Sequence, residues 1–153
     1  MKVLISYYSE SGKTEKMAQY IAEGVRFHGD EAVTKKMKDI KDASEMAGYD
    51  GYIFGSPTYS LDVPDTVKDF LLMAEKAGLE GKMSGAFGPY THDVAYGHEN
   101  HAPAIILDTL ERTSKMRPFE LGPFMLQEEE ANTSRGMETC QDYGRVFGEK
   151  LSG

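Results

Sequence analysis

The segment best suited to chemistry lies near the start of the chain, where small and hydroxyl-bearing residues follow a short apolar run. Its members are Ser9, Glu10, Ser11, Gly12, Lys13 and Thr14. Hydroxyl groups and closely spaced backbone N–H groups can donate hydrogen bonds to an anion. The N-terminus of a following helix adds roughly half a positive charge at the same point. We therefore predict that this loop binds a phosphate group.

The segments on either side place this loop between a strand and a helix. Before it, Val3-Leu4-Ile5 is an apolar run that is typical of a buried strand. After it, apolar residues recur at the spacing of one helical face: Met17, Ala18, Ile21, Ala22 and Val25. Gly29 follows where that helix should end. The loop is thus predicted to follow the carboxyl end of a strand.

Two kinds of phosphate loop compete for this segment. Gly12-Lys13-Thr14 matches the end of the Walker pattern of nucleotide triphosphatases, but that pattern needs a glycine where this chain has Tyr7. Residues 5–21 are similar instead to the phosphate loop of the flavodoxin family. The similar positions are Tyr7, Ser9, Gly12, Thr14, Ala18 and Ile21.

The chain departs from the family pattern at two positions in this segment. Ser6 stands where the family usually has an apolar or aromatic residue, and Lys13 stands where it usually has asparagine. The lysine charge either reinforces phosphate binding or points into solvent. Neither change removes the hydroxyl groups or the backbone amides that would bind the phosphate.

The length and the cysteine content limit the classes of protein to which this chain can belong. The 153 residues fit a single domain, residues 1–153, which is large enough to bury a core without disulfides. The one cysteine, Cys140, cannot form a disulfide within the chain. No signal-like segment opens the sequence, and no apolar run approaches the roughly 20 residues of a membrane span. We expect a cytoplasmic protein with no membrane partner.

The charge balance is acidic. Lysine and arginine number 17 against 25 aspartate and glutamate residues, which gives a net charge of −8. This charge repels nucleic acid and anionic lipid, and it favours a basic protein as partner. The acidic run Glu128-Glu129-Glu130 is interpreted as a solvent-exposed loop before the closing helix.

Strand and helix patterns alternate along the whole chain, which indicates an α/β fold. Further strands are expected at residues 31–38, 51–55, 82–87 and 119–126. Helices are expected from Pro64 to near Gly78, after Pro103, and over residues 137–151. The resemblance implies a doubly wound, open, parallel five-stranded sheet in the order 2-1-3-4-5, with helices on both faces.

A ligand of such a fold lies beyond the carboxyl ends of the strands, where three loops meet. After the phosphate loop, the second loop contains Ser56, Pro57, Thr58, Tyr59 and Ser60, and it is similar to the isoalloxazine loop of flavodoxin-type domains. The third loop, which resembles the other flavin-side loop, contains Gly88, Pro89, Tyr90 and Thr91. The resemblance implies FMN as cofactor, with Tyr59 and Tyr90 stacking on the ring. A single phosphate loop favours FMN over FAD.

A group of metal-ligand residue types follows the third loop: His92, Asp93, His98, Glu99 and His101. The glycine and asparagine among them indicate a loop, and no cysteine joins them. We expect no metal site here, and we interpret the segment as a polar loop that covers the ring or contacts a partner.

The resemblance implies an electron carrier, because the cofactor supplies the redox chemistry and no side chain need act as acid or base. We expect a low-potential one-electron carrier between redox proteins that have basic docking surfaces, present as a monomer or a weak dimer. The alternative is a flavodoxin-like NAD(P)H-dependent quinone or azo-compound reductase, whose substrate pocket would be built by residues 91–103.

Overall fold

A single parallel sheet forms the centre of the computed structural model, which describes residues 1–58, 62–91 and 101–153. Its strands are β1 (Lys2–Tyr7), β2 (Glu31–Lys36), β3 (Gly51–Gly55), β4 (Met83–Tyr90), β5 (Arg117–Pro118) and β6 (Phe124–Gln127). The order is β2-β1-β3-β4-β5, β6 also pairs with β4, and every pairing is parallel. The predicted fold class and the order 2-1-3-4-5 are confirmed.

The fifth position of the sheet differs from the single strand expected at residues 119–126. β5 and β6 both pair with β4, the Phe119 N–H still donates to the Ser84 carbonyl of β4 at 2.7 Å, and residues 120–123 form a turn between the two strands. Phe119 is 2% exposed, and its ring lies edge-on against Tyr143 and Phe147. The Gly122 N–H donates to the Phe119 carbonyl at 2.9 Å and closes a turn. The turn after Phe119 therefore interrupts the strand, while the Phe119 side chain packs beneath the last helix.

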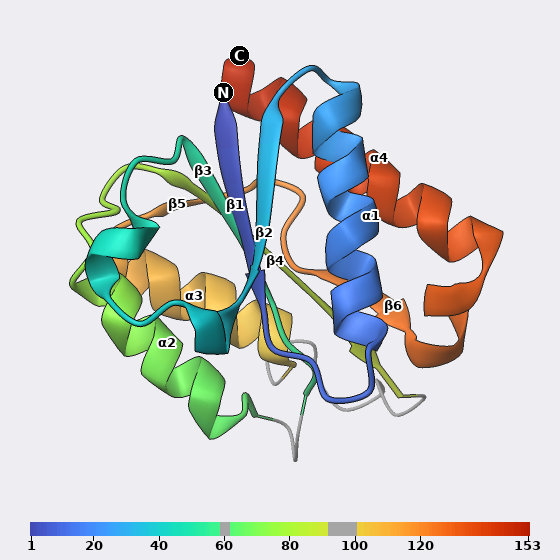
Figure 1. Cartoon of the computed structure of the whole chain (residues 1–153), viewed down its shortest axis with the longest axis horizontal. Coiled ribbons are helices and arrows are strands. Elements are labelled where there is room, and N and C mark those ends of the chain that lie inside the picture. Colours follow the sequence, from blue (N-terminus) through green and yellow to red (C-terminus); the bar gives the residue numbers. More distant parts are fainter. Residues whose placement is uncertain (59–61, 92–100) are drawn as a thin grey trace.

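Two helices cover each face of the sheet (Figure 1). α1 (Lys13–Phe27) and α4 (Ser134–Ser152) lie on one face, and α2 (Asp65–Glu75) and α3 (Ala102–Ser114) lie on the other. Short 3-10 helices are η1 (Met37–Asp39), η2 (Ala43–Met46) and η4 (Glu128–Asn132). Each face has its own buried apolar cluster. Among the described residues, no helix is both long and apolar enough to cross a membrane.

The first helix confirms its predicted pattern. Its buried residues include the five predicted apolar positions, Met17, Ala18, Ile21, Ala22 and Val25. The second helix begins at Asp65, one residue later than expected, with Pro64 as its N-cap. The amphipathic face of α1 fixes the direction of the helix across the sheet, and so also the position of the phosphate loop at its start.

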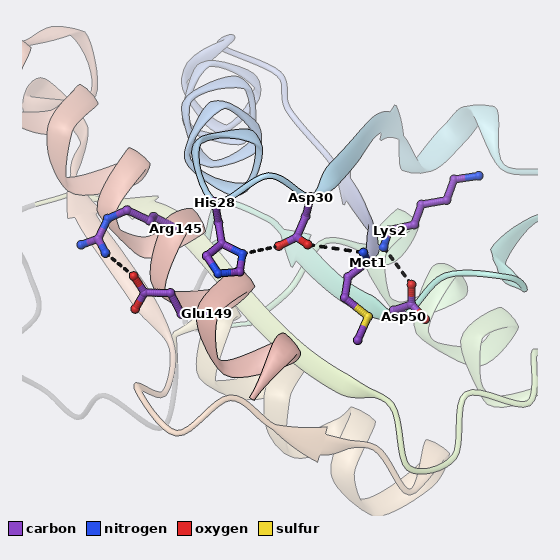
Figure 2. Close-up of polar contacts among 7 residues, drawn as sticks. All are labelled: Met1, Lys2, His28, Asp30, Asp50, Arg145 and Glu149. Atoms are coloured by element: carbon purple, nitrogen blue, oxygen red, sulfur yellow. Dashed lines mark hydrogen bonds and ion pairs between the residues drawn. The ribbon is translucent and has the colours of Figure 1, made fainter.

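Polar contacts secure the opposite edge of the sheet, where the strands begin. Figure 2 shows the Asp30 carboxylate between His28 Nδ1, at 2.8 Å, and the amino group of Met1, at 3.4 Å. The Lys2 N–H donates to Asp50 Oδ2 at 2.8 Å. These contacts join the start of β1 to the segments that precede β2 and β3. They leave the carboxyl ends of the strands for the functional loops.

Candidate functional site

The predicted phosphate loop lies between β1 and α1, as expected. The Gly12 N–H donates to Ser9 Oγ at 3.1 Å, which holds the loop in a turn. Gly12 has a φ of 89° and is the N-cap of α1. That left-handed conformation favours glycine, because other residues carry a Cβ that strains it. Ser9 is half-buried, while Glu10, Ser11 and Gly12 are exposed, so the loop borders solvent.

The loop presents hydrogen-bond donors that the protein does not satisfy. Within residues 1–58, 62–91 and 101–153, no acceptor is found for the backbone N–H groups of Ser11, Lys13 and Thr14. The N-cap residue supplies no side-chain hydrogen bond to the helix either. The first N–H groups of a helix need an external acceptor. An anion such as a phosphate fits this requirement.

A hollow of about 320 Å³ lies beside the loop, and Ser11 and Lys13 are among the residues that line it. Its lining residues are Ser11, Gly12, Lys13, Glu15, Lys16, Gln19 and Asn132. Thr14 is only 2% exposed, so its hydroxyl lies at the floor of the loop rather than on the surface. Tyr8, which directly precedes the loop, donates its hydroxyl hydrogen to Glu10 Oε1 at 2.6 Å.

Tyr7, the last residue of β1, is held as a proton donor beneath the loop. Its hydroxyl donates to Glu15 Oε2 at 2.9 Å. Burial and the Glu15 carboxylate together raise the pKa of Tyr7 to about 12. The phenol is therefore neutral at physiological pH, and it joins the end of β1 to the first turn of α1.

The second loop follows β3 and is joined to its neighbours through backbone contacts. The fully buried Ser56 donates its N–H to the Phe87 carbonyl at 3.1 Å and its hydroxyl to the Pro57 carbonyl at 2.7 Å. Thr58 Oγ1 accepts a hydrogen bond from the Ala102 N–H at 2.8 Å, which joins this loop to the start of α3. Tyr59 and Ser60 lie outside the described residues, so the predicted ring stacking by Tyr59 stays a prediction.

The third predicted loop is a strand over most of its length. Gly88, Pro89 and Tyr90 belong to β4, where they are in register with Met125, Leu126 and Gln127 of β6. The strand was expected to end at Phe87, but β6 gives it a pairing partner for three further residues. A Cβ on Gly88 would lie 2.0 Å from the Ser56 carbonyl oxygen, so glycine lets β4 approach the second loop.

The aromatic side chain of this third segment contacts a histidine. Tyr90 is half-buried, and its ring lies edge-on to that of His101, with centroids 6.4 Å apart and planes at 78°. His101 is 4% exposed and is the N-cap of α3. Thr91 is exposed. The rest of the predicted histidine segment, residues 92–100, lies outside the described residues, so its role stays a prediction.

The fold brings the three predicted segments to one edge of the sheet. β1, β3 and β4 are neighbours and run in parallel, so the residues after Tyr7 and Gly55 and those at the end of β4 share the edge (Figure 1). In the part of the chain that the structure describes, no three His, Cys, Asp or Glu side chains group to hold a metal. The arrangement can bind a phosphate and position a flat group beside it.

Lys13 has a partner that neither sequence interpretation named. Its Nζ lies 3.0 Å from Glu128 Oε1, and the two side chains are 30% and 32% exposed. Glu128 begins η4, directly after β6. The interpretation of residues 128–130 as a solvent-exposed loop is therefore wrong: they lie in η4, and of the three only Glu129 is exposed. The acidic run was the only feature of the sequence that pointed to an ion pair here, and it did not indicate that Glu128 would contact Lys13.

Comparison with known proteins decides the family. Residues 5–139 match the family model described as Flavodoxin. The chain belongs to the flavodoxin family. A flavodoxin from Clostridium saccharobutylicum is 37% identical over 87 residues, which are 57% of this chain and 54% of that protein. A protein named probable flavodoxin 2 from Bacillus subtilis is 31% identical over 150 residues, or 97% of this chain and 95% of that one.

The structural comparison agrees with the family. The crystal structure of oxidised flavodoxin 2 from Bacillus cereus has a TM-score of 0.81 and 28% identity, covering 98% of this chain and 99% of that one. Membership of the flavodoxin family implies an FMN cofactor, the role of an electron carrier and redox proteins as partners. The unsatisfied N–H donors of Ser11, Lys13 and Thr14 fit the phosphate of that cofactor.

Proposed function

We propose that this flavodoxin is a low-potential one-electron carrier that exchanges electrons with redox proteins through an acidic docking face. The observation that carries the proposal is the phosphate loop, whose unsatisfied N–H donors lie at the same edge of the sheet as both flavin-side segments. The sequence is 31% identical to that of probable flavodoxin 2 from Bacillus subtilis over 97% of this chain, which supports the role of an electron carrier.

Two groups of residues would hold the cofactor. The phosphate would be bound by the backbone and hydroxyl groups of residues 9–14, with Gly12 at the turn and Thr14 at the floor. The ring would lie against residues 56–60 and 88–91. FMN, when bound, supplies the redox chemistry, and the protein positions it and adjusts its potential. Ser56 and Gly88 keep the two ring-side segments in contact, which preserves the shape of the site.

The charges around this edge support a low potential and a basic partner. Exposed or half-exposed carboxylates follow the ends of several strands: Glu10 after β1, Asp62 and Asp65 after β3, and Glu128 and Glu129 after β6. A hydrogen bond from Lys68 keeps the pKa of Asp62 below its usual range, so this carboxylate stays ionised at neutral pH. Because Glu128 is paired with Lys13 and Asp62 with Lys68, the carboxylates of Asp65 and Glu129 contribute most to the negative charge, which opposes the addition of electrons to the site and attracts a basic surface.

The docking part of the proposal is tested by electron transfer to a basic cytochrome c in a stopped-flow instrument. The second-order rate constant should fall as ionic strength rises, because salt screens attraction between opposite charges. Asp65→Lys and Glu129→Lys should slow the reaction and flatten its salt dependence. Glu31→Lys, at the opposite edge of the sheet, is the control and should do so much less. A rate constant that is independent of salt would contradict an acidic docking face.

The reductase alternative is tested by adding NADH or NADPH, with and without a quinone, to the FMN-loaded protein under anaerobic conditions. A carrier should keep its oxidised absorbance for minutes and should show no nicotinamide-dependent quinone reduction. Rapid bleaching followed by multiple turnovers would assign the protein to the quinone or azo-compound reductases instead.

A further inference from the structure

The pair formed by Lys13 and Glu128 is an unusual feature of the phosphate loop in this chain. Lys13 belongs to the loop and Glu128 to η4, and their charged atoms are 3.0 Å apart. Lys13 and Asn132, the last residue of η4, line the same hollow beside the loop. The loop and η4 therefore face each other across the space that borders the unsatisfied N–H donors.

The pair also links the two halves of the site. Glu128 directly follows Gln127, the last residue of β6, which is in register with Tyr90 at the end of β4. Through Lys13, the phosphate loop is thus joined to the strand that carries the ring-side residues 88–90. Both side chains are about two-thirds buried, so the pair is screened less than a fully exposed one.

The charge of Glu128 decides how much of the lysine charge an anion experiences. An ammonium group whose neighbouring carboxylate lies at 3.0 Å forms a nearly neutral pair, which attracts a phosphate only weakly. We propose that Glu128 is a specificity-determining residue of the cofactor site, because it neutralises Lys13 and so lowers the preference of the loop for a phosphate-bearing flavin. The proposal rests on FMN binding at this loop.

The proposal predicts that FMN affinity rises when the Glu128 carboxylate is removed. A purely structural role of Glu128 would not produce a change in this direction. Removing the carboxylate leaves Lys13 as an uncompensated cation, so Glu128→Gln should tighten binding of FMN by about two- to five-fold at low salt. Riboflavin has the same ring but no phosphate, and its affinity should not change. Glu129→Gln removes an equal charge one residue away, from a side chain with no ion pair to Lys13, and serves as the matched control.

The test is a fluorescence titration of the apoprotein with FMN and with riboflavin, at low and at high salt, for the two glutamine variants and the unmodified chain. Lys13→Met completes a double-mutant cycle. Lys13→Met should weaken FMN binding in the unmodified chain, because it leaves the Glu128 carboxylate uncompensated beside the phosphate. In the Glu128→Gln background it should lower the tightened FMN affinity by about two-fold or more, back to about that of the unmodified chain, because neither charge remains. High salt should remove both effects.

Three results would overturn the proposal: Glu128→Gln weakens FMN binding, Glu128→Gln behaves as Glu129→Gln does, or the double variant binds FMN as tightly as Glu128→Gln alone. Failure of the unmodified chain to bind FMN at all would overturn the proposed function, and this inference with it. A normal FMN affinity in all variants would overturn this inference alone.

Discussion

Gly144 of α4 lies against the backbone of Ile21 in α1, so closely that a Cβ on Gly144 would be 2.0 Å from the Ile21 carbonyl oxygen. This contact sets the distance between the two helices that cover one face of the sheet. Since α1 begins at the phosphate loop, the same contact helps to fix the loop relative to the rest of the molecule.

Gly144→Ala should therefore destabilise the protein, by about 1–3 kcal/mol, because the added methyl group forces the helices apart. Alanine normally stabilises a helix relative to glycine, so the expected sign is opposite to that of helix propensity. Urea unfolding followed by circular dichroism measures the effect. Glu138→Ala, at an exposed position of α4, is the control and should change stability little. Equal or greater stability of Gly144→Ala would contradict the close approach.

Thr14→Val keeps the shape of the side chain and removes its hydroxyl. If this hydroxyl donates to the phosphate, FMN binding should weaken by about 1.5–3 kcal/mol, the usual range for a hydrogen bond to a charged group. Riboflavin binding should be unaffected. Thr113→Val, on α3, is a suitable control, because its hydroxyl donates to the Thr109 carbonyl within the helix. An unchanged FMN dissociation constant in Thr14→Val would remove this hydroxyl from the site.

Ser6 lies in β1 with its hydroxyl buried, and no hydrogen-bond partner for it is found in the part of the chain that the structure describes. Ser6→Ala should raise the free energy of unfolding by about 1 kcal/mol, because an unsatisfied buried hydroxyl is costly. Ser84→Ala offers the contrast: Ser84 is equally buried, but its hydroxyl donates to the Arg117 carbonyl at 3.5 Å. Its replacement should lower stability. Destabilisation by both substitutions to the same extent would show that Ser6 has a partner.

Because the pKa of Tyr7 is raised, we expect the free energy of unfolding to fall at alkaline pH. The pKa of Tyr7 is raised from an ordinary value of 10.0 to about 12, so above pH 10 the folded protein retains a proton that the unfolded chain loses. This contribution to stability is complete below the unfolded pKa and is lost as pH rises through the folded pKa. Tyr7→Phe should make the decline in unfolding free energy between about pH 10 and about pH 12 shallower. Glu15→Gln should act in the same direction but less, and an unchanged slope in Tyr7→Phe would contradict the cause.

The first helix and the loop before it could be predicted from the sequence because their signals are local, whereas the strand order followed from the resemblance to the flavodoxin family. The apolar spacing of α1 is read within one helix, and Ser9 and Gly12 lie three residues apart in a loop that closes on itself. The end of β4 was missed because Gly88 and Pro89 are typical turn residues, whereas here a second strand, β6, pairs with them.

The remaining differences come from contacts between distant parts of the chain. The strand expected at residues 119–126 is broken by a turn after Phe119, whose ring packs against Tyr143 and Phe147 of α4. Lys13 and Glu128 are 115 residues apart, so a local pattern cannot pair them. Both features depend on tertiary packing that only the folded chain reveals.

An anaerobic potentiometric titration of the FMN-loaded protein, followed by its absorbance spectrum, tests the central claim most directly. A low-potential one-electron carrier should take up two electrons in two resolved steps, with the second step at a potential below that of free FMN. Uptake of both electrons in a single step, at or above the potential of free FMN, would contradict the assignment of this flavodoxin as a low-potential one-electron carrier.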